Sequence, residues 1–319
     1  MRILTGLQPS GNLHIGNYFG AIKQMLSLQD NNEMLIFIAN YHAMTSNQNG
    51  EILKENSLKA AAAFLSLGID PQKSTFWLQS DVKEVLELYW ILSQFTPMGL
   101  LERAHSYKDK IAKGLNASFG LFSYPVLMAA DILLFDTQLV PVGKDQIQHV
   151  EIARDIALKA NNEWGEIFTL PNAKVNEEVA VVLGTDGAKM SKSYKNTIDI
   201  FADLKTTKKQ ISSIITNSTP LEEPKSWKDC NVFNIAKLFL DEKEQENLKS
   251  RYEKGGEGYG HFKMYLNDIV NDYFAKAKDD YKNLLAKPDK LKEILEFGAS
   301  KAKKIAQAKM QKIYEKIGL

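Results

Sequence analysis

A glycine-rich loop near the start of the chain carries residue types that can bind phosphate. Residues 2–7 predict a short buried strand, and apolar residues recur at helical spacing from Ile15 onward. Gly11, His14 and Gly16 lie between the predicted strand and the predicted helix. Free N–H groups at a helix N-terminus attract phosphate, and glycine lets the backbone approach a ligand closely. The loop therefore predicts phosphate binding, with His14 as a donor, although an ordinary strand–loop–helix with a surface histidine fits this segment equally well.

A second segment, far along the chain, carries two cations on a short loop. Lys189 and Lys192 are three residues apart among small side chains, and the turn-forming residues 184–187 precede them. Lysines on a mobile loop can neutralise a triphosphate and a departing pyrophosphate. A lysine cluster alone is more often a solvated basic turn. The presence of both segments in one chain favours a site for a nucleoside triphosphate.

The two segments together resemble the ATP signatures of class I aminoacyl-tRNA synthetases. His14-Ile15-Gly16-Asn17 is similar to the HIGH element of that family, and residues 189–193 match its KMSKS element at every position. Asn17 replaces the last histidine, which leaves open whether it makes the usual phosphate or ribose contact. Residues 5–11, 124–133 and 140–149 resemble segments of the bacterial-type tryptophanyl-tRNA synthetases. The resemblance covers essentially the whole chain and weakens beyond residue 193.

This resemblance implies a tryptophan–tRNA ligase, an enzyme that joins tryptophan to tRNA(Trp). Tryptophan and ATP would give tryptophanyl-adenylate and pyrophosphate, and the aminoacyl group would then pass to the tRNA. The resemblance assigns catalysis to His14, Lys110, Lys189 and Lys192, while the choice between Lys110 and Lys108 stays open. Mg²⁺ would accompany ATP on its phosphates without a dedicated carboxylate cage, and no zinc is expected.

The resemblance also implies the residues that surround each substrate. Asp131 lies in an apolar helical segment, and a buried carboxylate is a suitable acceptor for the indole N–H, which can only donate. Judged alone, Asp131 could instead pair with a neighbouring Lys or Arg or lie on an outer face. The tryptophan pocket is expected to contain Asp131, Tyr124, Gln146, His42, Met128, Val140 and Val142. The ATP site is expected to contain Gln8, Pro9, Ser10, Gly16, Asn17, Gly143, Lys144, Asp145, Val182, Lys189, Met190, Ser191, Lys192 and Ser193.

Strand and helix patterns alternate in the first part of the chain. Residues 35–40 and 75–79 read as buried strands around a helix at 52–67, which predicts an α/β fold with a doubly wound parallel sheet, Rossmann-like and of the HUP type. We expect a catalytic domain at 1–193, with a helical dimer-interface excursion at about 85–135. Residues 194–319 predict an all-helical domain, which the resemblance assigns to the tRNA anticodon, with a C-terminal helix that could pack back on the catalytic domain.

Composition and charge argue against a uniformly basic nucleic-acid-binding protein and against a secreted or membrane-spanning one. The 319 residues carry a net charge of +1, so no global basic field draws in nucleic acid. A basic tail helix, however, contains Lys301, Lys303, Lys304, Lys309, Lys312 and Lys316 and suits either a phosphate backbone or a solvated face. The single cysteine, Cys230, fits a reducing cytoplasm, and neither a signal peptide nor a membrane-spanning run is evident, so a cytoplasmic protein is expected. The resemblance implies a homodimer.

Three rival functions remain open on the sequence. Tyrosyl-tRNA synthetase shares the fold and the adenylate chemistry, but the segment around Asp131 looks suited to an indole rather than a phenol. A nucleotidyltransferase would share the HIGH-like loop but would not need the long helical part after the second motif. A non-enzymatic RNA-binding or regulatory module on the same scaffold is disfavoured, because His14, Lys189 and Lys192 are intact.

Overall fold

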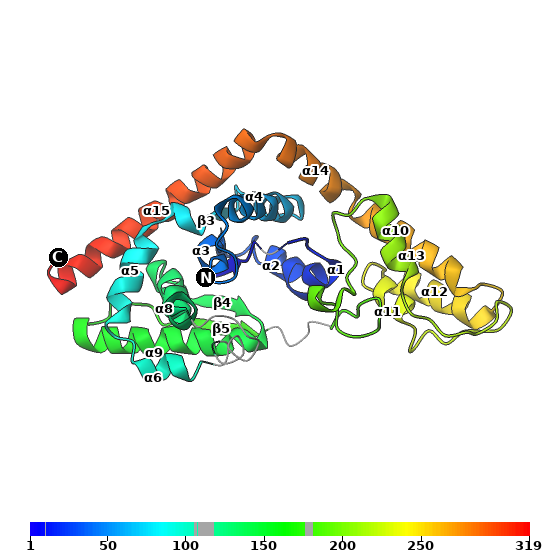
Figure 1. Cartoon of the computed structure of the whole chain (residues 1–319), viewed down its shortest axis with the longest axis horizontal. Helices are drawn as coiled ribbons and strands as arrows, with labels where there is room; N and C mark the ends of the chain where they lie inside the picture. The colour runs from blue at the N-terminus through cyan, green and yellow to red at the C-terminus, as the bar shows by residue number, and fades with distance from the viewer. Residues whose placement is uncertain (10, 105–106, 108–117, 176–180) are drawn as a thin grey trace. The chain divides into compact units, whose positions relative to one another are not determined.

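A computed structural model describes residues 1–9, 11–104, 107, 118–175 and 181–319, and at Asp145 and Val175 it describes the backbone alone. The chain forms two compact units, and neither is a continuous stretch of sequence. The first unit comprises residues 1–11, 28–177 and 284–319, and the second comprises 12–27 and 178–283. Figure 1 shows the elements of both.

The first unit is built on a parallel sheet with the strand order β3-β2-β1-β4-β5. The strands are β1 (Arg2–Leu7), β2 (Glu33–Ile38), β3 (Ser74–Leu78), β4 (Leu139–Val142) and β5 (Asn172–Val175). Its helices include α3 (Asn40–Ala43), α4 (Gly50–Ser66), α5 (Glu84–Ser93), α6 (Met98–Glu102), α8 (Phe119–Leu134), α9 (Ile147–Trp164) and α15 (Pro288–Ile317), with short 3₁₀ turns η2 (Gln79–Asp81) and η3 (Lys144–Gln146). The expected parallel α/β sheet is thus confirmed.

The order of the strands reverses between β1 and β4, which pair in parallel. Ligands of open α/β sheets bind beyond the carboxyl ends of the strands at such a switch point. The segments that follow β1 and β4 therefore leave the sheet at the same edge, and α3 and η2 follow β2 and β3 at that edge as well. Most of the sequence positions expected to bind tryptophan lie on these segments or on α8.

Helix α8, which carries Asp131, begins at Phe119. Its N-cap is Ser118, whose Oγ accepts a hydrogen bond from the backbone N–H of Leu121 at 3.1 Å. Pro125 lies inside the helix. Proline usually ends a helix, because it lacks an N–H and its ring crowds the preceding turn. Here the buried apolar residues on both sides of Pro125 hold the helix together, and they carry Asp131 into the core.

Helix α15 completes the first unit by packing on β3 and α5 (Figure 1). A Cβ at Gly298 would come within 1.9 Å of the carbonyl oxygen of Phe76, so only glycine permits this approach. Lys309 is 5% exposed, and its ammonium contacts the carboxylate of Asp136 and the carbonyl oxygen of Ile167. One of the six lysines of the basic tail helix is therefore buried in an ion pair rather than displayed on a solvated face.

The second unit is largely helical and carries both His14–Asn17 and the KMSKS element, residues 189–193. It contains α1 (Ile15–Asn17), a π-helical segment η1 (Tyr18–Ile22), α2 (Lys23–Ser27), a 3₁₀ turn η4 (Lys192–Tyr194), α10 (Leu204–Ser212), α11 (Asn231–Ala236), α12 (Glu242–Lys254) and α13 (Tyr259–Tyr273), and α14 (Ala275–Ala286) carries the chain back to the first unit. Along the part of the chain that the structure describes, no helix is long and apolar enough to cross a membrane.

Candidate active site

The HIGH-like loop is stabilised by its own asparagine. His14 is the N-cap of α1, and its backbone N–H donates to Oδ1 of Asn17 at 3.1 Å. This bond satisfies a donor that a helix start would otherwise leave open. Asn17 therefore shapes the loop through its amide oxygen. Its amide nitrogen is then the atom with which it could meet a ligand.

The ring of His14 is packed inside the second unit rather than displayed on its surface. The residue is 5% exposed, and Nδ1 has no hydrogen-bond partner among the described residues. A Cβ at Gly16 would lie 2.9 Å from this Nδ1 and 3.3 Å from Cβ of Met190, so glycine leaves the room that the ring occupies. Burial, together with the charge of Lys192, lowers the pKa of His14 to about 4, and Asp199 only partly opposes this. His14 is therefore a neutral imidazole near pH 7, a hydrogen-bond donor rather than a cation.

Backbone hydrogen bonds join the first motif to the segment that follows the second. The N–H of Ile15 donates to the carbonyl of Ile198 at 3.0 Å, and the N–H of Ile200 donates to the carbonyl of Leu13 at 2.9 Å. Asp199 lies between these bonds, and its carboxylate accepts from Thr197 and Gln210. The two motifs, about 175 residues apart in the sequence, are thus held together in one unit.

The KMSKS loop is organised by a buried asparagine. Oδ1 of Asn196 accepts from the backbone N–H of Ser191 at 2.7 Å, and Nδ2 donates to Asp186 at 2.7 Å and to the carbonyl of Lys189 at 3.1 Å. Its own carbonyl accepts from the N–H of Thr185 at 2.9 Å. A Cβ at Gly184 would lie 2.3 Å from the Asn196 side chain, which explains the glycine there. A single amide therefore fixes both ends of the loop.

The two lysines of this loop differ in their surroundings. Both are exposed, but Lys192 borders a cavity of about 360 Å³ that is also lined by Asn12, Thr185 and Lys195. Burial lowers the pKa of the Lys192 ammonium, although the residue as a whole is exposed, and the charge of Asp199 partly offsets this. The other loop positions expected to contact ATP divide into the buried Val182 and Met190, linked by a backbone hydrogen bond of 2.9 Å, and the more accessible Ser191 and Ser193.

The remaining positions expected to bind ATP belong to the first unit. Gln8 and Pro9 follow β1, and Gly143 and Lys144 follow β4, so all four lie at the carboxyl edge of the sheet. Gln8, Gly143 and Lys144 are exposed there. Ser10, Lys110 and the alternative Lys108 lie outside the described residues, as does the side chain of Asp145.

Asp131 lies at the centre of a buried hydrogen-bonded cluster. The residue is 3% exposed, and its Oδ2 lies 2.8 Å from Nε2 of His42. Nε2 of Gln79 donates to both carboxylate oxygens, at 2.9 and 2.8 Å. Burial raises the pKa of Asp131, while the bonds from His42 and Gln79 act in the opposite direction. The partners described for this carboxylate are thus an imidazole and an amide, not the Lys or Arg of the alternative interpretation.

The other positions expected to bind tryptophan extend from this cluster. The rings of His42 and Tyr124 meet edge to face with their centroids 6.2 Å apart, and the hydroxyl of Tyr124 lies 2.8 Å from Nε2 of the buried His149. Gln146 ends η3 at the carboxyl edge of the sheet. The apolar members belong to the hydrophobic core or pack against it: Val140, Val142 and Met128. His42, Tyr124 and Asp131 are therefore brought together.

Three residues of these clusters escape prediction from the sequence. Gln79 donates to Asp131, Asn196 fixes the KMSKS loop, and the charge of Asp199 acts on His14 and Lys192. A signal exists for Gln79, because a polar residue directly after a buried strand lies at the carboxyl edge of a parallel sheet. Asn196 and Asp199 follow the second motif closely but resemble ordinary turn residues.

The lowered pKa of His14 can be measured directly. We expect the ring resonances of His14, assigned by their loss in His14→Gln, to show no titration between pH 8 and pH 5, because burial holds the pKa at about 4. An unfolded histidine binds a proton below about pH 6.5, so His14 should cost folding stability as the pH falls from there toward 4. A midpoint near 6.5 in the NMR titration of the folded protein would contradict the buried, neutral ring.

Comparison with known proteins gives the family. The sequence model of one protein family, the class I tRNA synthetases (W and Y), matches residues 1–275. The chain belongs to this family. It is 80% identical to the tryptophan–tRNA ligase of Campylobacter jejuni, with all of both chains covered, and 51% identical to that of Fusobacterium nucleatum, with all of this chain and 98% of the relative covered.

A solved member of the family agrees over the whole fold. The crystal structure of the tryptophanyl-tRNA synthetase of Campylobacter jejuni, complexed with ADP and tryptophan, matches with a TM-score of 0.98, 80% identity and complete coverage of both chains. The chain is therefore a tryptophan–tRNA ligase among the class I synthetases, and the comparisons support neither the tyrosyl nor the nucleotidyltransferase alternative.

Proposed function

We propose that this class I synthetase activates tryptophan with ATP and transfers it to tRNA(Trp) through the residues described above. The observation that carries the assignment of roles is that the bonds of Ile15 and Ile200 join the segment around His14 to the segment that follows the KMSKS loop, within one unit. This arrangement gives ATP a neutral donor and two ammonium groups on one body. The proposal assigns His14 to the α-phosphate, and Lys189 and Lys192 to the departing pyrophosphate.

In the first step a carboxylate oxygen of tryptophan attacks the α-phosphorus, and the bond to the bridging oxygen of the β-phosphate breaks. The carboxylate is already a nucleophile, so no protein base is needed and catalysis consists of alignment and charge stabilisation. Lys189 and Lys192 stabilise the charge that develops on pyrophosphate. In the second step a ribose hydroxyl of the tRNA attacks the activated carbonyl carbon, and AMP leaves.

In this proposal the indole N–H donates to the carboxylate of Asp131. An ionised carboxylate offers about four acceptor positions, and the bonds from His42 and Gln79 leave capacity for one more donor. Tyr124 and Gln146 bind the ammonium of the substrate, and Met128, Val140 and Val142 contact the ring. A site built around such a bond discriminates strongly against side chains that cannot make it.

Mg²⁺ enters this proposal on the phosphates of ATP. Among the described residues there is no group of three His, Cys, Asp or Glu side chains that could hold a metal ion. Phosphate oxygens are the ligands that Mg²⁺ commonly uses in nucleotide sites. The ion would neutralise phosphate charge alongside Lys189 and Lys192.

The experiment that tests the proposal is amino-acid-dependent exchange of pyrophosphate into ATP. The protein is assayed with each of the twenty amino acids and no tRNA, and exchange with tryptophan alone is the expected result. Exchange with tyrosine and not tryptophan would remove the assigned specificity. A complete lack of exchange would remove the adenylate chemistry.

The role of Asn196 gives a prediction for the KMSKS loop. Asn196→Ala removes the side-chain hydrogen bonds to Ser191, Asp186 and Lys189, so the loop loses the amide that fixes it. We expect the single-turnover rate of adenylate formation to fall about tenfold, on the order of one or two lost hydrogen bonds, with the KM for tryptophan nearly unchanged. Asn217→Ala, an exposed asparagine bonded to Thr219 in the same unit, is the matched control. Equal rates in the two variants would contradict the role of Asn196.

We assign recognition of the anticodon to the helices that follow the KMSKS loop in the second unit, on the resemblance alone. The site of action in this proposal is the cytoplasm, where tRNA and ATP are available. The buried free thiol of Cys230 is compatible with the reducing conditions there.

We also propose that the protein acts as a homodimer through α5, α6 and α8. Large apolar side chains on or beside these helices are exposed, with Trp90 at 67%, Met98 at 61% and Phe119 at 72%. Exposed apolar side chains gathered on neighbouring elements mark interaction surfaces. Trp90→Glu should shift the protein from dimer to monomer in light scattering, while Leu204→Glu, at an equally exposed leucine on α10, should not.

A further inference from the structure

The side chain of Gln79 connects the carboxylate of Asp131 to the backbone of α3. It is 2% exposed and lies immediately after β3, at the start of η2. Its amide oxygen accepts from the backbone N–H of Tyr41 at 3.0 Å and from that of His42 at 3.4 Å. Its amide nitrogen donates to both oxygens of Asp131.

These contacts determine which way the amide points. A backbone N–H can only donate, so the atom of Gln79 that faces Tyr41 and His42 must be the oxygen. The nitrogen must then face Asp131. An amide NH₂ group also only donates, and it meets a carboxylate favourably when the carboxylate offers acceptors toward it. The backbone N–H groups of Tyr41 and His42 therefore fix the orientation of the Gln79 amide, so that its NH₂ group faces the carboxylate of Asp131.

We propose that Gln79 is a positioning residue that keeps Asp131 an oriented, hydrogen-bond-accepting carboxylate, and that it thereby sets the preference for a side chain with an indole N–H. Gln79 acts through Asp131 and needs no contact with the substrate. The inference rests on the proposed function, because it assumes that Asp131 accepts the indole N–H.

Burial would otherwise favour a protonated Asp131. Burial raises the pKa of this carboxyl, and the bond from Gln79 opposes that shift. A protonated carboxyl has fewer acceptor positions and presents a donor of its own. Among the described residues, the carboxylate is bonded to one titratable side chain, His42 of α3, and to the neutral amide of Gln79 from η2.

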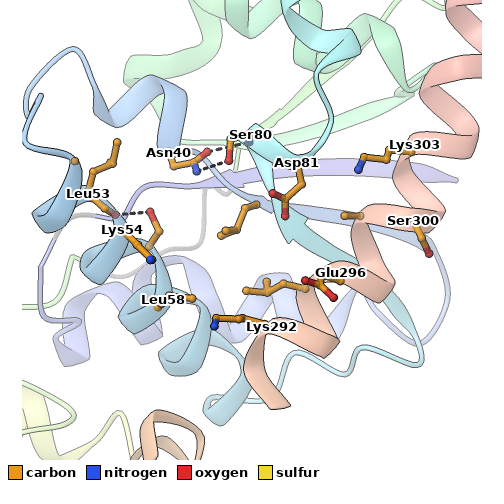
Figure 2. Close-up of a pocket in the computed structure, with 15 residues that line it drawn as sticks. Asn40, Leu53, Lys54, Leu58, Ser80, Asp81, Lys292, Glu296, Ser300 and Lys303 are labelled. Atoms are coloured by element: carbon orange, nitrogen blue, oxygen red, sulfur yellow. Dashed lines mark hydrogen bonds between the residues drawn. The ribbon is translucent and has the colours of Figure 1, made fainter. Parts of the chain in front are cut away.

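The backbone that carries Gln79 is itself tied to the backbone that carries His42. The side chain of Asn40 donates to Oγ of Ser80 at 2.8 Å and accepts from the N–H of Ser80 at 3.0 Å, as the dashed lines of Figure 2 show. This reciprocal pair lines a cavity of about 720 Å³ on the first unit. Residues 40–42 and 79–80 therefore form one hydrogen-bonded layer, with little freedom for Gln79 to choose another orientation.

The test compares tryptophan with its analogue in which sulfur replaces the indole N–H, β-(3-benzothienyl)alanine. For each protein the quantity measured is kcat/KM for tryptophan divided by kcat/KM for the analogue, both in pyrophosphate exchange. Gln79→Met keeps the length of the side chain and removes its hydrogen bonds. We expect the ratio to fall about tenfold, because the loss is confined to the compound that has the N–H, and the KM for ATP to stay within about twofold.

A buried glutamine at the other end of β3 provides the matched control. Gln29 is 8% exposed, and its amide bonds to Gly68, Asp70 and Ser74, the first residue of the strand. Gln29→Met should cost a comparable amount of thermal stability and leave the ratio as in the wild type. Gln79→Glu is the second variant. It keeps the volume and the acceptor for Tyr41, but it places a second carboxyl against Asp131, so the two share a proton and Asp131 has less capacity to accept the indole N–H.

Each outcome bears on the proposal. A lower ratio in both Gln79 variants, with the wild-type ratio in Gln29→Met, supports it. Equal losses for both compounds in Gln79→Met, or an unchanged ratio in Gln79→Glu, would overturn it. Failure of the proposed function looks different, because wild-type protein would then show no tryptophan-dependent exchange at all.

Discussion

Replacement of Asp131 by alanine is expected to lower kcat/KM for tryptophan about 100-fold and to leave the KM for ATP nearly unchanged. The variant loses a charge-assisted hydrogen bond to the indole N–H, and His42 and Gln79 lose the acceptor that they share. Bonds to charged groups contribute roughly 1.5–3 kcal/mol, and a donor left unsatisfied adds its own penalty. The measurement is pyrophosphate exchange, with tryptophan and ATP varied separately.

Two further variants separate this effect from general damage. Asp131→Asn keeps the volume and one acceptor oxygen, so its kcat/KM for tryptophan should lie between those of Asp131→Ala and the wild type. Glu151→Ala removes an exposed carboxylate from α9 in the same unit and should behave as the wild type. If Asp131→Ala raises the requirements for tryptophan and ATP equally, Asp131 does not read the indole.

Strong periodic patterns in the sequence predict the framework of the sheet. The apolar runs that indicate strands at residues 2–7, 35–40 and 75–79 correspond to β1, β2 and β3 within one or two residues. Their alternation with the helix at 52–67 is enough to predict a parallel sheet. Strand β5 is not predicted, because Asn172–Val175 is four residues long and its two apolar residues, Ala173 and Val175, are too few to establish an alternating pattern. Its pairing with β4 comes from the fold as a whole.

The motifs predict which residues matter more readily than they predict how those residues are held. His14 and Lys192 stand out by type and spacing, yet the neutral state of His14 follows from its burial and the charge of Lys192. The bond between His42 and Asp131 joins positions 89 residues apart, and neither local propensity nor periodicity carries such information. Asn196 lies so close to the second motif that turn chemistry alone explains an asparagine there.

Replacement of Lys192 by alanine is expected to slow the formation of tryptophanyl-adenylate by about 100- to 1000-fold. Removal of one preorganised donor from developing charge typically has this effect. The partial burial that lowers the pKa of Lys192 also weakens the screening of its charge by water, which strengthens its action on phosphate. Because the loss concerns charge that develops as pyrophosphate departs, the KM for tryptophan should change little. A single-turnover assay of adenylate formation, started with saturating tryptophan and ATP, measures the rate directly.

The matched variants of this experiment distinguish charge from structure. Lys192→Arg keeps a cation at the loop and should recover part of the rate, though not all, because the planar guanidinium replaces a compact ammonium. Lys208→Ala removes an exposed lysine from α10 in the same unit and should keep the wild-type rate. A normal single-turnover rate in Lys192→Ala would show that the loop does not stabilise the leaving pyrophosphate. A loss of the same size in Lys208→Ala would show that net charge on the unit, and not the position of Lys192 beside His14, controls the reaction.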